Sequence, residues 1–253
     1  MRATGLRVGN NSFWTIGKGS LESGGVFRKQ RLCDEAMQNL TLIPVDRALP
    51  VPARWRSEVE RVLINEEEIA RRVHQMSEEI QRDFQGRELV VVSLLNGTVM
   101  FLADLVRHLT VPLRLDFMGV SSYGAGTESG ELVFTKELRL DVRGRDVLLV
   151  DDILDTGKTL QKVLARLRVL KPRRIRTCVL LDKASRRVEP VKANYVGFEI
   201  PDHFVVGYGL DFAERYRNLP FVGVLHPQIY KQVSKRVING EDHSLKGRKG
   251  KRK

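Results

Sequence analysis

The chain has 253 residues, of which 42% are hydrophobic and 29% are charged, and its formal net charge is +12. This composition is typical of a soluble globular protein, and no uncharged apolar run approaches the roughly 20 residues of a membrane-spanning helix. The two cysteines, Cys33 and Cys178, do not have the spacing of a zinc site or a disulfide framework, so we expect a reduced, cytoplasmic setting.

The first 55 residues carry scattered Gly, Ser, Asn and Arg without a sustained hydrophobic period. We predict that residues 1–55 are an extension without stable packing. Regular structure is predicted to begin near Asn65, a suitable N-cap for a helix with three glutamates in its first turn. Apolar residues then recur at helical spacing, at Ile69, Val73, Met76 and Ile80.

Two units with the order strand, helix, strand follow this first helix. They are predicted at 89–95, 100–106 and 112–118, and then at 145–150, 159–170 and 175–181, with a turn at 151–157. The run 89–95 is continuously apolar and β-branched, which is typical of a strand buried on both faces. With further short strands at 195–198, 205–208 and 222–225, the order predicts an α/β fold with a mostly parallel sheet flanked by helices.

The most informative segment is VLLVDDILDTGKT, residues 147–159. A buried strand runs into Asp151 and Asp152, and a third carboxylate follows at Asp155. A turn then opens a helix, and it consists of Thr156, Gly157, Lys158 and Thr159. Ligands of open α/β sheets bind beyond the carboxyl ends of the strands, where the amino end of a helix offers N–H groups to an anion. The segment therefore predicts a phosphate cradle beside acids that can accept sugar hydroxyls or hold Mg²⁺.

Two other interpretations of this segment are weaker. A nucleotide-triphosphate P-loop needs a glycine five positions before Gly157, and that place holds Asp152, which would repel the triphosphate. The acids could also be a helix cap and surface residues, but three acids within five positions at the end of a strand do not favour that reading.

With these residues in view, the chain resembles the type I phosphoribosyltransferases, and among them the enzymes that act on 6-oxopurines. The resemblance covers residues 60–232. Besides the acidic motif it includes LNG at 95–97, SSYG at 121–124, LDK at 181–183 and VGFEIPDHFVVGYGLD at 196–211. It implies the type I phosphoribosyltransferase fold, which adds a small hood region to the central sheet.

The resemblance also implies the reaction. The 5-phosphoribosyl group of phosphoribosyl pyrophosphate would pass to N9 of hypoxanthine, and of guanine, giving IMP or GMP and pyrophosphate in purine salvage. Mg²⁺ is the implied cofactor, and Asp151, Asp152 and Asp211 are its implied ligands. The first two acids would hold the ribose hydroxyls, directly or through the ion. Asp155 would act as the general base that takes the proton from N7 of the purine.

The remaining roles concern the phosphates and the base. The turn 156–159 would bind the 5-phosphate. Pyrophosphate would be contacted by Asn96, Gly97, Ser121, Tyr123 and Arg217. The purine would be bound by Lys183, Phe204, Val205 and Asp211: the lysine would donate to O6, the phenylalanine would stack on the ring, and the Val205 backbone would pair with its edge.

Two segments of the site have particular features. Residues 121–131, rich in Gly and Ser, resemble a loop that closes over the active site and excludes water. Many relatives carry lysine where this chain has Asn96, in a dipeptide that often contains a cis bond. Asparagine keeps the backbone donors and loses a cation, so we expect weaker pyrophosphate or dimer contacts there.

The charge distribution leaves a second class of function open. Residues 246–253 are nearly all basic, and we interpret residues 236–253 as a solvated tail after a domain at 56–235. Such a tail also suits contact with RNA, and the alternative function is a nucleic-acid-binding regulator built on the same fold. The presence of Asp155, Lys183 and the stretch 204–211 favours the enzyme. The family usually forms dimers or tetramers, so a homo-oligomer is expected.

Overall fold

The computed structural model of the protein describes residues 49–123 and 131–231, and in the strands at 122, 123 and 131 only the backbone. The predictions for residues 1–48, for most of the loop 121–131 and for the tail 236–253 therefore lie outside the described residues. No described helix has the length and apolar character needed to cross a bilayer.

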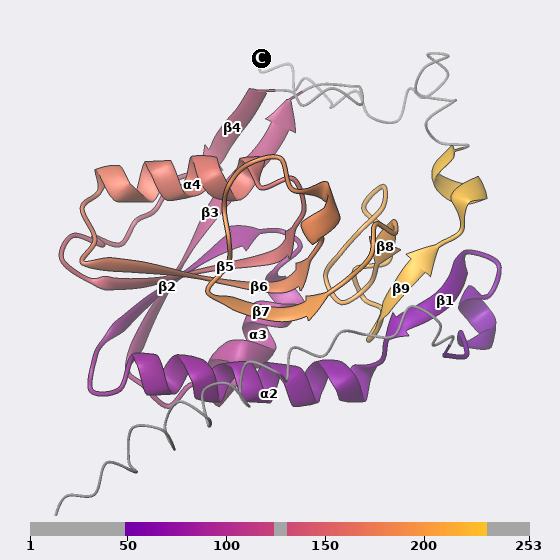
Figure 1. Cartoon of the computed structure of the whole chain (residues 1–253), viewed down its shortest axis with the longest axis horizontal. Coiled ribbons are helices and arrows are strands. Elements are labelled where there is room, and N and C mark those ends of the chain that lie inside the picture. Colours follow the sequence, from indigo (N-terminus) through magenta and orange to yellow (C-terminus); the bar gives the residue numbers. More distant parts are fainter. Residues whose placement is uncertain (1–48, 124–130, 232–253) are drawn as a thin grey trace, which may run out of the picture. The chain divides into compact units, whose positions relative to one another are not determined.

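Six of the described strands form one sheet in the order β4-β3-β2-β5-β6-β7. Their bounds are β2 Leu89–Leu95, β3 Leu113–Tyr123, β4 Glu131–Lys136, β5 Asp146–Leu154, β6 Arg174–Asp182 and β7 Tyr195–Glu199. All neighbours are parallel except β3 and β4, which are antiparallel. The predicted α/β fold with a mostly parallel sheet is confirmed, and Figure 1 shows its twist.

Helices cover both faces of this sheet because its central strands present buried apolar side chains to both faces. Side chains alternate between the faces of a strand. In β2, Val91 therefore packs in a cluster with α2 (Glu66–Asp83) and α3 (Val99–His108), whereas its neighbours Val90 and Val92 pack in a second cluster with α4 (Lys158–Val169). The arrangement can be followed in Figure 1.

The helix predicted to begin after Asn65 does so. Asn65 Oδ1 accepts a hydrogen bond from the Glu68 backbone N–H at 2.8 Å, and Glu68 Oε2 accepts one from the Asn65 N–H at 3.0 Å. This reciprocal capping box satisfies two N–H groups that the helix itself cannot, and such a cap stabilises by about 1 kcal/mol.

A second, smaller sheet, which we call the hood, consists of β1 Val59–Ile64, β9 Val222–Leu225 and β8 Val205–Val206 in antiparallel order β1-β9-β8. The prediction that regular structure begins near Asn65 is wrong, since β1 and the 3₁₀ turn η1 Ala53–Trp55 come before it. β1 forms because it pairs with β9, more than 150 residues later in the chain. Residues 49–55, inside the predicted extension, pack against the hood through Leu49, Val51 and Trp55.

Several predicted element bounds change for reasons of pairing. β5 does not end at Val150, because it stays paired with β6 as far as Leu154, so Asp151 and Asp152 are strand residues and not part of a turn. β3 extends beyond residue 118 because β4, which was not predicted, pairs with it. The predicted strand 205–208 is shorter, since Gly207 and Tyr208 have positive φ.

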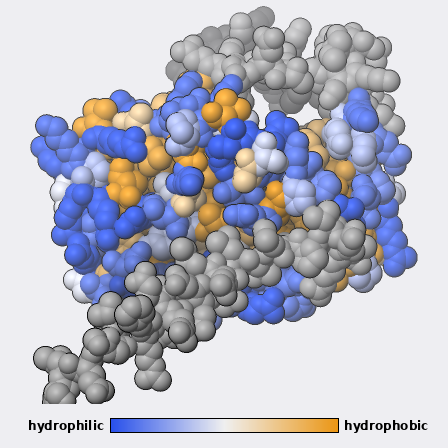
Figure 2. Space-filling view, in the orientation of Figure 1, coloured by the Kyte–Doolittle hydropathy of each residue, from blue (hydrophilic) through white to orange (hydrophobic). Residues whose placement is uncertain are grey.

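The surface of the described residues is largely polar. The face drawn in Figure 2 is mostly hydrophilic, with apolar residues scattered over it. Among the exposed large apolar side chains are Met100, Leu115, Val133 and Phe204. Single exposed apolar residues are normal on soluble proteins. Of these four, Phe204 is a predicted site residue.

Candidate functional site

The two adjacent acids lie at the carboxyl end of β5. Asp151 Oδ1 accepts a hydrogen bond from the Asp152 N–H at 3.0 Å, and Asp152 Oδ1 accepts one from the Ile153 N–H at 2.8 Å. Burial and the neighbouring Asp152 carboxylate raise the pKa of Asp151, and burial also raises the pKa of Asp152. Two carboxylates held side by side in this way favour a cation or hydroxyl donors as their ligand.

The loop after β2 lies directly against the second of these acids. A Cβ added to Gly97 would lie 1.7 Å from Asp152 Oδ2, so only glycine fits at this contact. The Leu95–Asn96 peptide bond is cis, as the resemblance implies, and the Asn96 side chain is exposed. Ser93 Oγ and Thr98 Oγ1 form a buried hydrogen bond of 2.7 Å that ties the two ends of the loop together.

The segment after β8 completes this side of the site. A Cβ added to Gly209 would lie 1.9 Å from Gly97 O. Arg217 Nη1 donates to Gly209 O at 2.9 Å, and Arg217 Nη2 lies 2.9 Å from Asp211 Oδ1. The Arg217 charge also acts to lower the pKa of Asp152, against the effect of burial. The structure thus brings Asp152, Gly97, Arg217 and Asp211 together, as the sequence predicts.

The turn 156–159 links β5 to α4. Gly157, with φ of +88°, is the N-cap of α4 and has no side chain to cap the helix, but Thr156 Oγ1 accepts a long hydrogen bond of 3.5 Å from the Lys158 N–H at that end. The turn is braced from outside: the N–H groups of Val188 and Glu189 donate to Thr156 O at 2.9 and 3.0 Å. A Cβ on Gly157 would lie 2.7 Å from Val191 Cγ2. No local pattern predicts this brace, because it depends on residues 188–191 of a later segment.

Asp155 and Lys183 belong to one network of alternating charges. The Lys183 backbone N–H donates to Leu154 O at 3.0 Å, and its side chain is buried. Burial lowers the pKa of Lys183, and the charges of Asp155 and Asp202 act in the opposite direction. Lys183 Nζ lies 3.8 Å from Asp202 Oδ1. The predicted base and the predicted purine-binding lysine therefore feel each other's charge.

Arg186, which sequence reasoning missed, joins the two acids of this network. Its Nε lies 2.9 Å from Asp155 Oδ1, and the two groups form an ion pair whose angles do not meet those of a hydrogen bond. Its Nη1 lies 3.4 Å from Asp202 Oδ2. Asp202 was missed as well. The only signal available was that both residues lie close in sequence to predicted site residues, Lys183 and Phe204.

Phe204 and Val205 lie at the start of β8. Phe204 is 40% exposed, and its ring stacks on Tyr230 and meets Phe212 edge-on. Val205 is buried and pairs with Val224 of β9. Ser121 is exposed and pairs with Val133 on the β3–β4 arm, and none of the contacts above reaches it. The side chain of Tyr123 lies outside the described residues.

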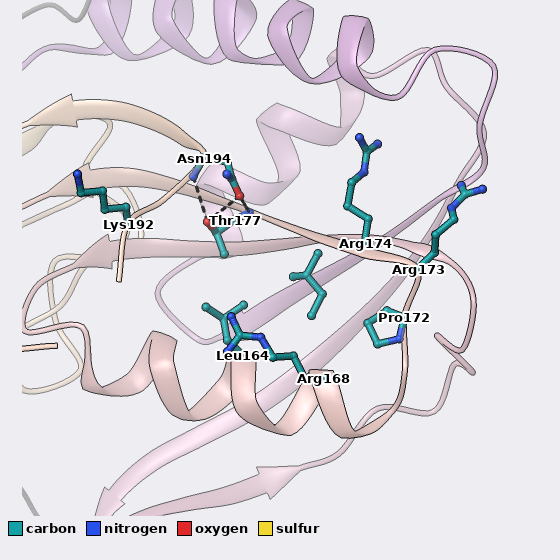
Figure 3. Close-up of a pocket in the computed structure, with 9 residues that line it drawn as sticks. Leu164, Arg168, Pro172, Arg173, Arg174, Thr177, Lys192 and Asn194 are labelled. Carbon is teal, nitrogen blue, oxygen red and sulfur yellow. Dashed lines mark hydrogen bonds between the residues drawn. The ribbon is translucent and has the colours of Figure 1, made fainter. Parts of the chain in front are cut away.

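A separate pocket of about 330 Å³ lies elsewhere, beside α4 and the first half of β6 (Figure 3). It is lined by Leu164, Arg168, Pro172, Arg173, Arg174, Ile175, Thr177, Lys192 and Asn194. Arg173 turns away to bind the buried Asp146, and Arg174 lies over the Phe84 ring. The pocket is thus at the amino ends of the strands, whereas the acids above are at the carboxyl ends, where ligands of open α/β sheets bind.

The acids of the site suit a hydrated divalent ion better than a closed protein cage. No group of three or more His, Cys, Asp or Glu with metal-binding geometry occurs among the residues that the structure describes. Mg²⁺ commonly takes one or two carboxylates and fills its other positions with water and substrate phosphates. The pair Asp151 and Asp152, whose pKa values are raised by burial, fits that pattern.

The chain is similar to known phosphoribosyltransferases over most of its length. The family profile of the phosphoribosyl transferase domain matches residues 61–213. The hypoxanthine-guanine phosphoribosyltransferase of Bacillus subtilis is 46% identical over 177 residues, 70% of this chain and 98% of that protein. The enzyme of the same name from Staphylococcus aureus is 43% identical over 175 residues, 69% of this chain and 98% of that protein.

A solved structure agrees with the sequence relatives. The hypoxanthine phosphoribosyltransferase of Staphylococcus aureus superimposes with a TM-score of 0.68 at 42% identity and covers 72% of this chain and 99% of that one. These relatives carry enzyme names and give no support to the alternative of a nucleic-acid-binding regulator. The chain belongs to the phosphoribosyl transferase domain family and, within it, to the hypoxanthine-guanine phosphoribosyltransferases.

Proposed function

We propose that this purine salvage enzyme transfers the 5-phosphoribosyl group from phosphoribosyl pyrophosphate to N9 of hypoxanthine and guanine in the cytoplasm, as a homo-oligomer. The observation that carries the proposal is the contact of Gly97 with Asp152 at the end of β5, two elements from which the pyrophosphate and ribose sites would be built. The amino end of α4 follows three residues after β5 and is the phosphate site.

The sugar phosphate is held at two points. The N–H groups of the turn 156–159 and the hydroxyls of Thr156 and Thr159 bind the 5-phosphate. Asp151 and Asp152 accept the ribose hydroxyls. Asn96 and Gly97, together with Arg217, contact the pyrophosphate. Ser121 and Tyr123 belong to the arm from which the closing loop extends, and we assign them to pyrophosphate in the closed state.

Asp151, Asp152 and Asp211 would hold Mg²⁺. When bound, the ion would supply positive charge that stabilises the pyrophosphate leaving group. The chain's own contribution is to place the charge of Arg217 where it acts to lower the pKa of Asp152, against the effect of burial, and to exclude water from the cation-like sugar once the loop has closed.

The purine base is recognised by residues that follow β6 and by residues at β8. Lys183 donates to O6, Phe204 stacks on the ring, and the backbone of Val205, with Asp211 beyond it, faces the base edge. In the transfer, N9 forms a bond to the anomeric carbon while the bond from that carbon to pyrophosphate breaks. Asp155 takes the proton from N7. Arg186 Nε lies 2.9 Å from Asp155 Oδ1, and the charge of Asp155 acts on Lys183, so the Asp155 side chain is held near the proposed purine-binding lysine.

Steady-state kinetics with hypoxanthine, guanine, xanthine and adenine, each with phosphoribosyl pyrophosphate and Mg²⁺, tests the function. We expect turnover of hypoxanthine and guanine. Adenine should react at least about 100-fold more slowly, because its 6-amino donor would face the Lys183 donor. The Asp155→Asn variant should lose about 100-fold or more in kcat, and Asp141→Asn, an exposed acid away from the site, serves as its control. Equal rates with adenine, or a fully active Asp155→Asn, would contradict the assignment.

A further inference from the structure

The described chain ends in a short helical turn, residues 227–231, that follows β9 and carries Tyr230. The turn is fixed at its start, because the His226 N–H donates to Glu58 O at 2.9 Å and the Ile229 N–H donates to His226 O at 2.9 Å. Ile229 and Tyr230 both pack against the apolar cluster of the hood. Tyr230 is therefore held in place by the hood and not by the main sheet.

Tyr230 makes a specific ring contact with Phe204. The two centroids are 4.9 Å apart and the ring planes differ by 17°, so one ring covers a face of the other. Phe212 meets Phe204 edge-on, with centroids 5.4 Å apart and planes at 89°. Phe204 nevertheless stays 40% exposed. Tyr230 thus covers one face of Phe204, Phe212 packs at a right angle to the ring, and 40% of Phe204 remains exposed to a ligand.

We propose that Tyr230 is a positioning residue for the purine base: it stacks on Phe204, so that the exposed part of that ring is presented at a fixed angle. This proposal rests on the proposed function, in which Phe204 stacks on the base. An exposed phenylalanine without such support would have to be ordered when the base binds, and that ordering would weaken binding. Tyr230 and Phe212 order the ring beforehand.

The experiment compares Tyr230→Ala and Tyr230→Phe with the unchanged full-length chain, in steady-state kinetics with hypoxanthine and phosphoribosyl pyrophosphate varied in turn. We expect Tyr230→Ala to raise the KM for hypoxanthine about two- to tenfold, the range of one aromatic stack. The kcat and the KM for phosphoribosyl pyrophosphate should stay within about twofold. Tyr230→Phe keeps the ring and should restore the KM for the base.

Trp55→Ala is the matched control for a damaged hood. Trp55 packs in the same apolar cluster, where it meets Tyr216 with centroids 5.9 Å apart, and it is not a ring partner of Phe204. This variant should lower the melting temperature while the KM for hypoxanthine stays unchanged. The same rise in that KM for Trp55→Ala as for Tyr230→Ala would reduce Tyr230 to a general structural residue and overturn the proposal.

A double-mutant cycle decides whether Tyr230 acts through Phe204. In a Phe204→Ala background, Tyr230→Ala should change the KM for hypoxanthine no further. The proposal is overturned if Tyr230→Ala leaves that KM unchanged, or if it has its full effect in the Phe204→Ala background. It is also overturned if Tyr230→Ala lowers the KM for hypoxanthine, because Tyr230 would then occupy the place of the base. If Phe204→Ala alone leaves the KM unchanged, the role of Phe204 in the proposed function fails first, and the two failures are thereby distinguished.

Discussion

At the scale of single residues, the site depends on the close approach of the Gly97 backbone to the Asp152 side chain. Gly97 lies so close to Asp152 that any side chain there would displace the carboxylate. Gly209 in turn lies against the Gly97 carbonyl, and Arg217 holds Gly209. The three segments fix each other through glycines because only a bare backbone allows this approach.

Gly97→Ala tests that packing. Its Cβ would lie 1.7 Å from Asp152 Oδ2, so the carboxylate must move by more than an ångström. We expect kcat/KM for phosphoribosyl pyrophosphate to fall about 100-fold or more, since a misplacement of that size at a reacting centre costs about that factor. Steady-state kinetics measure it. Gly86→Ala, which meets nothing within 4 Å, is the control. A Gly97→Ala enzyme with normal kcat/KM would show that Asp152 does not hold the sugar.

Arg186 offers a second test at this scale. Its ion pairs with Asp155 and Asp202 orient the proposed base and, through Asp202, reach Lys183. The side chains are about half exposed, so each pair contributes little, and we expect Arg186→Gln to lower kcat/KM for hypoxanthine by up to about fivefold. Arg166→Gln breaks a similarly exposed pair with Glu137 outside the site and should have no effect on the same kinetics. Equal values for both variants would remove Arg186 from the site.

At the scale of elements, the acids are positioned by the carboxyl end of β5 and the amino end of α4. β5 and α4 are contiguous, so the sequence alone predicts that Asp151, Asp155 and the turn at 156–159 lie together. The predicted turn at 151–157 was nevertheless wrong, since β5 continues to Leu154. Hydrophobic pattern marks the middle of a strand, whereas its end is set by how far the neighbouring strand continues to pair.

Asp116 of β3 ties that strand to the segment after β4. It accepts hydrogen bonds from the N–H groups of Arg139 and Leu140 at 2.6 and 3.0 Å and from Lys136 Nζ at 3.0 Å. Burial acts to raise the pKa of Asp116, but these bonds and that of the Phe117 N–H outweigh it and lower the pKa to about 2.

The pKa of Asp116 predicts a dependence of stability on pH. A carboxyl group whose pKa is lower in the folded state stabilises above its unfolded pKa of about 4, and that stabilisation disappears as the pH falls towards 2. It amounts to about 2 kcal/mol at neutral pH. Urea unfolding should show Asp116→Asn to be less stable by about that amount at pH 7, with the difference shrinking below pH 4. A difference that does not change between pH 7 and pH 3 would contradict the assignment, and Asp141→Asn is the control.

At the scale of the whole molecule, the main sheet and the hood are held together by apolar and polar contacts. Hood residues Ile64, Val205 and Val222 join the core cluster of α2 and α3. Tyr208 donates its hydroxyl hydrogen to Asp104 Oδ2 of α3 at 2.6 Å. The proposed base site, with Lys183 on one side and Phe204 on the other, would therefore span the two sheets.

The sequence by itself determined the parallel core, the helix capped by Asn65 and the cradle of residues 151–159, because each depends on neighbours in the chain: periodicity, caps and a strand leading into a turn. Resemblance to a family added the distant partners Gly97, Lys183 and Phe204. Their roles with substrate stay predictions, as does the effect of asparagine at position 96.

Only the tertiary structure decided which distant residues meet. The pairing of β1 with β9, the Arg186–Asp155 ion pair and the stack of Tyr230 on Phe204 join segments that are not neighbours in the chain. No local pattern marks such partners, because the free energy that selects them comes from burying apolar surface and pairing charges across the folded molecule. Features that depend on local propensity could therefore be predicted from the sequence, whereas features that depend on long-range burial required the tertiary structure.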